Sequence, residues 1–163
     1  MKELLEKLGS YNIFNYLLPG VLFAAFIDWS TSIKLLQVNM AVGAFVYYFL
    51  GSIVSRIGSL LIEPAFLRLG LVEFAQYEDF VRAAKTDPKL EILSEVNNMY
   101  RTICSLILSM AVVGAYQYAA SHLALLQRAA PIVIVCGLFV LYLVSYRKQT
   151  AYIRKRIAAN IQK

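Results

Sequence analysis

The stretch that decides the fold covers residues 51–102, opening with GSIVSRIGSLLIEP (51–64) and closing with SEVNNMYRT (94–102). Both of its ends lie in strongly apolar sequence, yet it contains six of the sixteen Lys and Arg residues and seven of the ten acidic residues. Charge concentrated between apolar segments is typical of a loop outside the bilayer. We therefore predict a helical hairpin at about 63–102, between two pairs of transmembrane helices.

The composition excludes an ordinary soluble domain. Hydrophobic residues make up 60% of the 163 residues and charged residues 16%, and the mean hydropathy is +0.61. Typical globular proteins have about 45–50% apolar and about 25% charged residues. Because a small domain leaves much of its surface exposed, a chain this apolar needs a bilayer to cover it. We predict one all-α polytopic membrane domain covering residues 1–163.

Four apolar stretches are long enough to be transmembrane helices. Pro19 and Gly20 are expected to kink or break the first of them, which is short enough that a re-entrant segment is the alternative. Pro64 is expected to end or bend the second. Residues 1–9, MKELLEKLG, have the spacing of a short amphipathic helix at the membrane surface. The predicted spans are 13–29, 40–62, 103–120 and 130–146.

The distribution of Lys and Arg predicts the orientation. The N-terminal arm has two, the central stretch 51–102 with the hairpin has six and the tail at 147–163 has six, whereas the two short turns have only Lys34 and Arg128. Cytoplasmic loops of membrane proteins carry an excess of Lys and Arg. Both termini and the hairpin are therefore predicted to be cytoplasmic. Asp28, at the end of the first span beside Trp29, is expected at the opposite interface.

A polar cluster is predicted where the hairpin enters the membrane. Glu95, Asn98 and Arg101 share one face of a helix, and Arg56 and Glu63 are two turns apart on another. We expect pairs between Glu63 and Arg101 and between Arg56 and Glu95. The alternative for Arg56 is a place at the boundary, reaching lipid phosphates. The cluster either links the second and third spans or forms a docking or gating site.

The tail carries a basic helical pattern. Its cations are interleaved with Tyr152, Ile153 and Ile157, which is typical of a helix lying on anionic lipid. An acidic protein partner is the alternative. The residues predicted to contact lipid or partner are Arg147, Lys148, Arg154, Lys155 and Arg156.

Enzymatic, metal-binding and nucleic-acid-binding functions have no sequence support. No metalloprotease, nucleophile-elbow or Walker motif occurs. Cys104 and Cys136 are expected at different depths and His122 is the single histidine, so neither a disulfide nor zinc is predicted. The positive charge follows the loops rather than a nucleic-acid-binding motif. We predict a non-enzyme with no cofactor and no direct nucleic-acid contact.

Four segments carry a resemblance: SYNIFNYLLPGVLF (10–23), GSIVSRIGSLLIEP (51–64), SEVNNMYRT (94–102) and SYRKQTAYIRKRI (145–157). They resemble small bacterial four-span membrane proteins, and the chain is similar to the membrane subunit of Kiwa-type phage-defence systems. The resemblance covers most of the chain and includes no catalytic signature. It implies a bacterial inner-membrane protein that oligomerises and works with a separate soluble DNA-binding partner.

The leading functional expectation is a membrane sensor or anchor whose hairpin and tail recruit a soluble cytoplasmic partner, in anti-phage defence. The alternative is an ion channel or membrane-permeabilising effector, in which the second and third spans line a pore. A transporter is disfavoured, because no span carries a clear acidic residue at mid-membrane depth.

Overall fold

The computed structural model describes residues 9, 11–122 and 124–161 and, within them, contains helices and no strand. Four helical segments are long and apolar enough to cross a membrane: Ile13–Ser30, Met40–Arg68, Lys89–His122 and Ala129–Ala159. The all-α fold with four such helices is thus confirmed. In chain order the elements are η1 (Ile13–Leu17), α2 (Leu18–Ser30), α3 (Met40–Ile57), η2 (Gly58–Ile62), α4 (Glu63–Arg68), α5 (Tyr77–Thr86), α6 (Lys89–His122) and α7 (Ala124–Ile161).

Two prolines are accommodated by π-helical turns rather than by helix ends. Pro19 lies in the first turn of α2 directly after η1, and Pro64 lies in the first turn of α4 directly after η2. Proline lacks an N–H and its ring crowds the carbonyl of the preceding turn, so the wider π turn gives it room. The second apolar helix therefore continues past the predicted boundary at 62 to Arg68.

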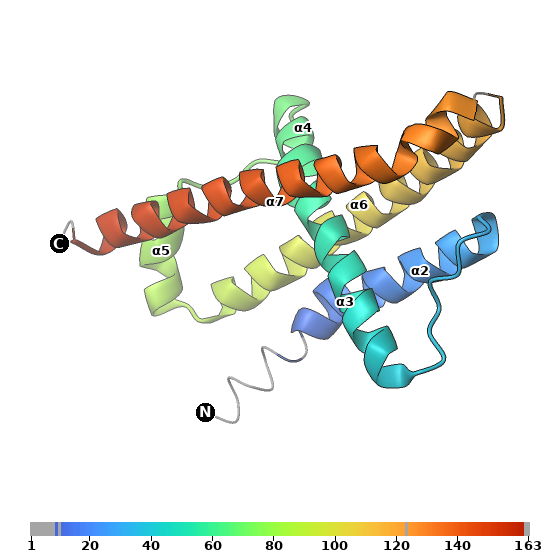
Figure 1. Cartoon of the computed structure of the whole chain (residues 1–163). Coiled ribbons are helices and arrows are strands. Elements are labelled where there is room, and N and C mark those ends of the chain that lie inside the picture. The colour runs from blue at the N-terminus through green and yellow to red at the C-terminus, as the bar shows by residue number, and fades with distance from the viewer. Residues whose placement is uncertain (1–8, 10, 123, 162–163) are drawn as a thin grey trace.

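The first two helical segments cross at contact distance between backbones. A Cβ atom placed on Gly20 would lie 1.7 Å from the carbonyl oxygen of Tyr47, and one on Gly51 would lie 1.7 Å from that of Tyr16. Only glycine fits at both positions. In Figure 1, α3 runs obliquely past α6 and α7, whereas α2 lies alongside α6. Close approach through glycine is a common way for helices to pack in a membrane.

The loop between the first two apolar helices is fixed by two polar side chains. The carboxylate of Asp28 accepts hydrogen bonds from the backbone N–H groups of Leu35 and Leu36, and Lys34 lies 3.8 Å from it. Asn39 caps the N-terminus of α3, because its side-chain oxygen accepts the N–H of Ala41 at 2.9 Å. Asp28 therefore has a structural role in shaping this loop.

The predicted hairpin is formed by α5 and the start of α6, which meet at Asp87. The N–H of Lys89 donates to the Asp87 carboxylate at 3.0 Å. As expected, the second helix of the hairpin continues without interruption into the third apolar segment. Residues 69–76 form an extended connector between α4 and α5, with Gly70 at φ +67°. The predicted N-terminal amphipathic helix lies outside the described residues, apart from Gly9.

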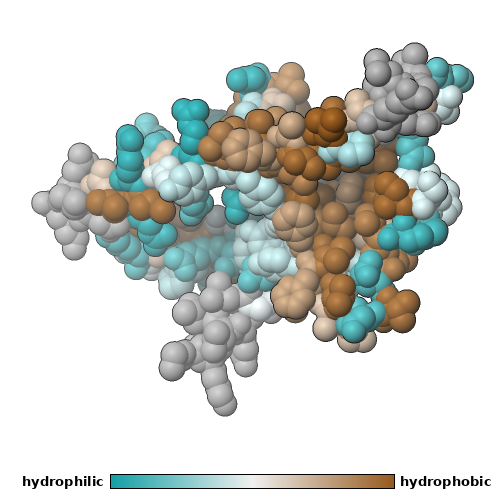
Figure 2. All heavy atoms as spheres, in the orientation of Figure 1, coloured by the Kyte–Doolittle hydropathy of each residue, from teal (hydrophilic) through white to brown (hydrophobic). Residues whose placement is uncertain are grey.

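The last helix is longer than the predicted fourth span. α7 contains 38 residues, so the basic tail is a direct continuation of the apolar segment. Residues 124–128, expected in a polar turn, lie in this helix because Ala, Leu, Gln and Arg are strong helix formers. Figure 2 shows apolar atoms over α2, α3 and the middle of α6 and α7, and hydrophilic atoms around α5. We call this hydrophilic part, formed by α5, residues 89–101 and residues 147–161, the polar end.

Candidate functional site

A buried polar layer joins three helical segments just inside the polar end. The Thr102 hydroxyl donates to the side-chain oxygen of Asn15 at 2.8 Å and lies 3.3 Å from the Ser55 hydroxyl. Asn15 in turn donates to Ser55 at 3.4 Å, and all three residues are buried. The Ser105 hydroxyl donates to the carbonyl oxygen of Val54 at 2.7 Å. These groups satisfy one another, as buried polar groups must when water is excluded.

Next to this layer, Glu63 is the acceptor for two cations from two other helices. One carboxylate oxygen is 2.5 Å from the Arg101 guanidinium on α6, and the other is 2.9 Å from the Lys148 ammonium on α7. The side chains of Glu63 and Arg101 are 13% and 19% exposed. The expected pair between Glu63 and Arg101 is therefore present, and Lys148 is added to it.

Lys148 is held by three acceptors, which matches its three donor hydrogens. Besides Glu63, it donates to the carbonyl oxygen of Ser59 at 2.7 Å and to the Ser59 hydroxyl at 2.8 Å. Its ammonium also lies 5.7 Å from the centre of the Tyr152 ring. The prediction that Lys148 contacts lipid or a partner is replaced by this internal role, which fastens α7 to η2.

The expected pair between Arg56 and Glu95 does not form. Within the described part of the chain, Arg56 has no ion pair and no side-chain hydrogen bond to Glu95. The π turn η2 lies between Arg56 and Glu63, so these seven residues no longer complete two regular turns. Arg56 is half-buried and faces a cleft. Its expected place at the membrane boundary stays a prediction.

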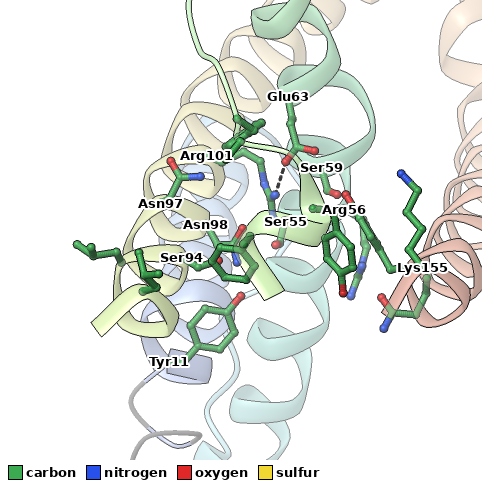
Figure 3. A pocket seen from close by; sticks show the side chains of 18 of the residues that line it. Tyr11, Ser55, Arg56, Ser59, Glu63, Ser94, Asn97, Asn98, Arg101 and Lys155 are labelled. Carbon is green, nitrogen blue, oxygen red and sulfur yellow. Dashed lines mark hydrogen bonds and ion pairs between the residues drawn. The ribbon is translucent and has the colours of Figure 1, made fainter. Parts of the chain in front are cut away.

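That cleft has a volume of about 710 Å³ and opens where α3, α5, α6 and α7 meet. Figure 3 shows Arg101 reaching from α6 to Glu63, with Arg56 on the helix that carries Glu63 and Lys155 on neighbouring α7. Four tyrosines contribute to the walls. The polar and aromatic residues of the lining are Tyr11, Tyr16, Ser55, Arg56, Ser59, Glu63, Phe74, Tyr77, Phe80, Ser94, Asn97, Asn98, Arg101, Gln149, Tyr152 and Lys155.

Cations outnumber acids in the cleft. Among the residues that the structure describes, Arg56, Arg101 and Lys155 line it, against one carboxylate, that of Glu63. The Nε of Arg101 is buried and has no hydrogen-bond partner among the described residues. Burial raises the pKa of the Tyr11 phenol, so this side chain is neutral at physiological pH and acts as a hydrogen-bonding hydroxyl.

The structure brings together part of the predicted cluster and part of the predicted tail. Arg56, Glu63, Asn98 and Arg101 all line the cleft, whereas Glu95 does not. From the tail, Lys155 also lines it, and Arg147, Arg154 and Arg156 are exposed on α7. The predicted site is therefore divided between the ion-paired group around Glu63 and a set of exposed cations on α7.

The remaining candidates do not join this site. Cys104 on α6 and Cys136 on α7 are free and exposed. The ring of His122 meets that of Tyr118 edge-on, with centroids 5.1 Å apart. No group of three or more His, Cys, Asp or Glu residues that could hold a metal occurs among the described residues.

Sequence reasoning missed Asn15, although the signal was present. Asn15 is an amide inside the first apolar segment, and polar residues at such positions usually face other helices. The role of Lys148 had no comparable signal, since its partner Glu63 is 85 residues away and lies on another helix.

No family model matches this chain, and neither a curated protein nor a solved structure matches it. The resemblance to Kiwa-type membrane subunits therefore stays a prediction.

Proposed function

We propose that this protein is a non-enzymatic membrane sensor or anchor that recruits a soluble cytoplasmic protein through its polar end. The observation that carries the proposal is that α5, the start of α6 and the end of α7 pack together and extend beyond the apolar segments. At 1.5 Å per residue, the 38 residues of α7 are about 57 Å long, against about 30 Å for the hydrocarbon core of a bilayer. A large part of α7 therefore lies outside the membrane.

The polar end is held together by contacts of its own. The rings of Tyr77 on α5 and Tyr152 on α7 have centroids 5.9 Å apart, and Val81 on α5 is buried. α5 contacts both α6 and α7, so the extension is a three-helix unit. In Figure 1, α5 lies between the start of α6 and the end of α7. Such a unit presents a defined surface outside the membrane.

That surface combines apolar and basic side chains. Leu71, Leu93 and Ile157 are 64%, 60% and 54% exposed, although they lie in the polar end or its connector. A contiguous apolar patch outside a bilayer indicates an interaction surface, and these side chains are the ones we propose to contribute to it. The exposed cations Arg154 and Arg156 on the same stretch favour an acidic partner surface, and anionic lipid is the competing ligand.

The cellular setting is part of the proposal. The excess of Lys and Arg on the hairpin and tail favours a cytoplasmic polar end, in a bacterial inner membrane with both termini cytoplasmic. The apolar window of α7 is only 6% buried within the chain, which leaves a face for lipid or for a second copy in a homo-oligomer. We include anti-phage defence in the proposal because the chain resembles Kiwa-type membrane subunits.

The test is purification of the tagged chain from its host in mild detergent, with mass spectrometry of the retained proteins. We expect a soluble protein in fixed stoichiometry, retained by wild type and by Ile157→Leu but lost with Ile157→Glu. The same pair of variants should then differ in phage plating efficiency on cells that carry both genes. A homo-oligomer that retains no soluble protein and conducts ions in liposomes would replace the proposal with the channel alternative.

A further inference from the structure

We propose that the cleft beside Glu63 is a binding site for a phosphate-bearing small ligand. This goes beyond the proposed function, because recruiting a protein requires no small molecule. The inference starts from the charges of the cleft. Arg56, Arg101 and Lys155 line it from three different helices, and Glu63 is the one carboxylate that the described residues contribute to it.

The Glu63 carboxylate is already ion-paired with two cations, so it does not neutralise the other cations of the cleft. Its two oxygens are bound to Arg101 and Lys148, of which Lys148 is fully occupied by three acceptors. Among the described residues, Arg56 and Lys155 have no ion pair. The cleft thus has an excess of positive charge, which an anion would neutralise.

The arrangement of donors favours phosphate over a carboxylate. Guanidinium groups bind phosphate oxygens through paired N–H donors, and a lysine adds a point charge. Cations converging from three helices surround a tetrahedral group with three terminal oxygens better than a planar one with two. The side chains of Ser94, Asn97 and Asn98 line the same space and supply neutral donors.

The walls can also hold an organic group. Tyr11, Tyr16, Tyr77, Tyr152 and Phe80 line the cleft, and its volume of about 710 Å³ is of the size that binds small organic ligands. The cleft lies beside the polar end, where α5 and residues 89–101 of α6 meet α3 and α7 (Figure 3). A phosphate group in the cleft has two possible sources: the headgroup of an anionic phospholipid and a soluble organic phosphate. The recognising chemistry is shared by both.

The experiment is thermal unfolding of the full chain in neutral detergent at constant ionic strength. The probes are inorganic phosphate, ATP as a soluble organic phosphate, and phosphatidylglycerol added to the micelles, with sodium chloride as the ionic control. A ligand that binds the folded state raises the unfolding temperature in a saturable manner. A response to phosphate or ATP indicates a soluble ligand, and a response to phosphatidylglycerol alone indicates a lipid headgroup.

Three variants locate the response. Arg56→Gln and Lys155→Gln should each weaken the affinity for the responding probe at least about tenfold, which corresponds to one lost charged contact. Arg154→Gln, on the exposed face of the same tail, should leave the affinity unchanged. The proposal is overturned if no probe gives a saturable response. It is equally overturned if Arg56→Gln and Lys155→Gln respond as strongly as wild type.

Discussion

The buried polar layer and the cleft beside it use similar residues in opposite ways. In the layer, Asn15, Ser55 and Thr102 satisfy one another, and next to the layer the Lys148 ammonium has an acceptor for each of its three hydrogens. In the cleft, Arg56 and Lys155 have no ion pair among the described residues. A satisfied buried network holds helices together, whereas unpaired cations facing a cavity are available to a ligand. The difference separates structural from functional residues within one predicted cluster.

The largest effect is expected where the first two helical segments touch. Gly51→Leu places a side chain where a single Cβ would already lie 1.7 Å from the Tyr16 carbonyl oxygen, and so separates Asn15 from Ser55. We expect a loss on the order of 4 kcal/mol or more, and hence no accumulation of folded protein. Immunoblotting of membranes measures the accumulation of the protein, and thermal unfolding in detergent measures the loss of stability.

Gly137 supplies the matched control for this substitution. Among the described residues, nothing lies within 4 Å of a Cβ placed there. Gly137→Ala should keep or raise stability by about 0.5–1 kcal/mol, because alanine is the better helix former. If Gly51→Leu folded as well as Gly137→Ala, the claim that the first two helical segments touch backbone to backbone at Gly51 would be contradicted.

The second largest effect is expected at Glu63. Glu63→Ala leaves Arg101 and Lys148 without their carboxylate, and removing one partner of a buried ion pair costs about 3 kcal/mol. Glu95→Ala is the control, since Glu95 has no ion pair among the described residues and should change stability by less than about 0.5 kcal/mol. Equal losses in the two variants, measured by thermal unfolding, would contradict the assignment of Glu63 as the shared acceptor.

A smaller effect is expected inside the polar layer. Thr102→Val keeps the shape of the side chain but removes the hydroxyl that donates to Asn15. We expect a loss of about 1 kcal/mol, typical of a hydrogen bond between helices in a membrane. Thr86→Val, at the exposed end of α5, should be close to neutral in the same unfolding assay. A neutral Thr102→Val would show that the layer does not hold the three helices together.

Much of the fold follows from the sequence because lipid imposes simple rules. Apolar length predicts the four long helices, and helical spacing predicts the continuity of the hairpin with α6. The pair between Glu63 and Arg101 could also be predicted, since each residue lies near the end of an apolar segment. These features depend on local composition and on depth in the membrane.

The rest depends on how the helices meet. The π turn η2 lies between Arg56 and Glu63, and the periodicity of a regular helix does not include the change in turn that it introduces. Lys148 is fastened to Ser59 because α7 crosses η2 at that level, which no local pattern specifies. The predicted pair between Arg56 and Glu95 is therefore wrong, and the cleft could not be predicted from the sequence.

The most direct test of the division between structural and ligand-binding residues is the unfolding temperature of Arg56→Gln beside that of Glu63→Ala, both purified in the same detergent. Each kcal/mol shifts the unfolding temperature of a chain this size by roughly 2–4 °C. We expect Glu63→Ala to unfold about 10 °C below wild type and Arg56→Gln within about 2 °C of it. If Arg56→Gln fell as far as Glu63→Ala, Arg56 would belong to the structural network, and the division would be contradicted.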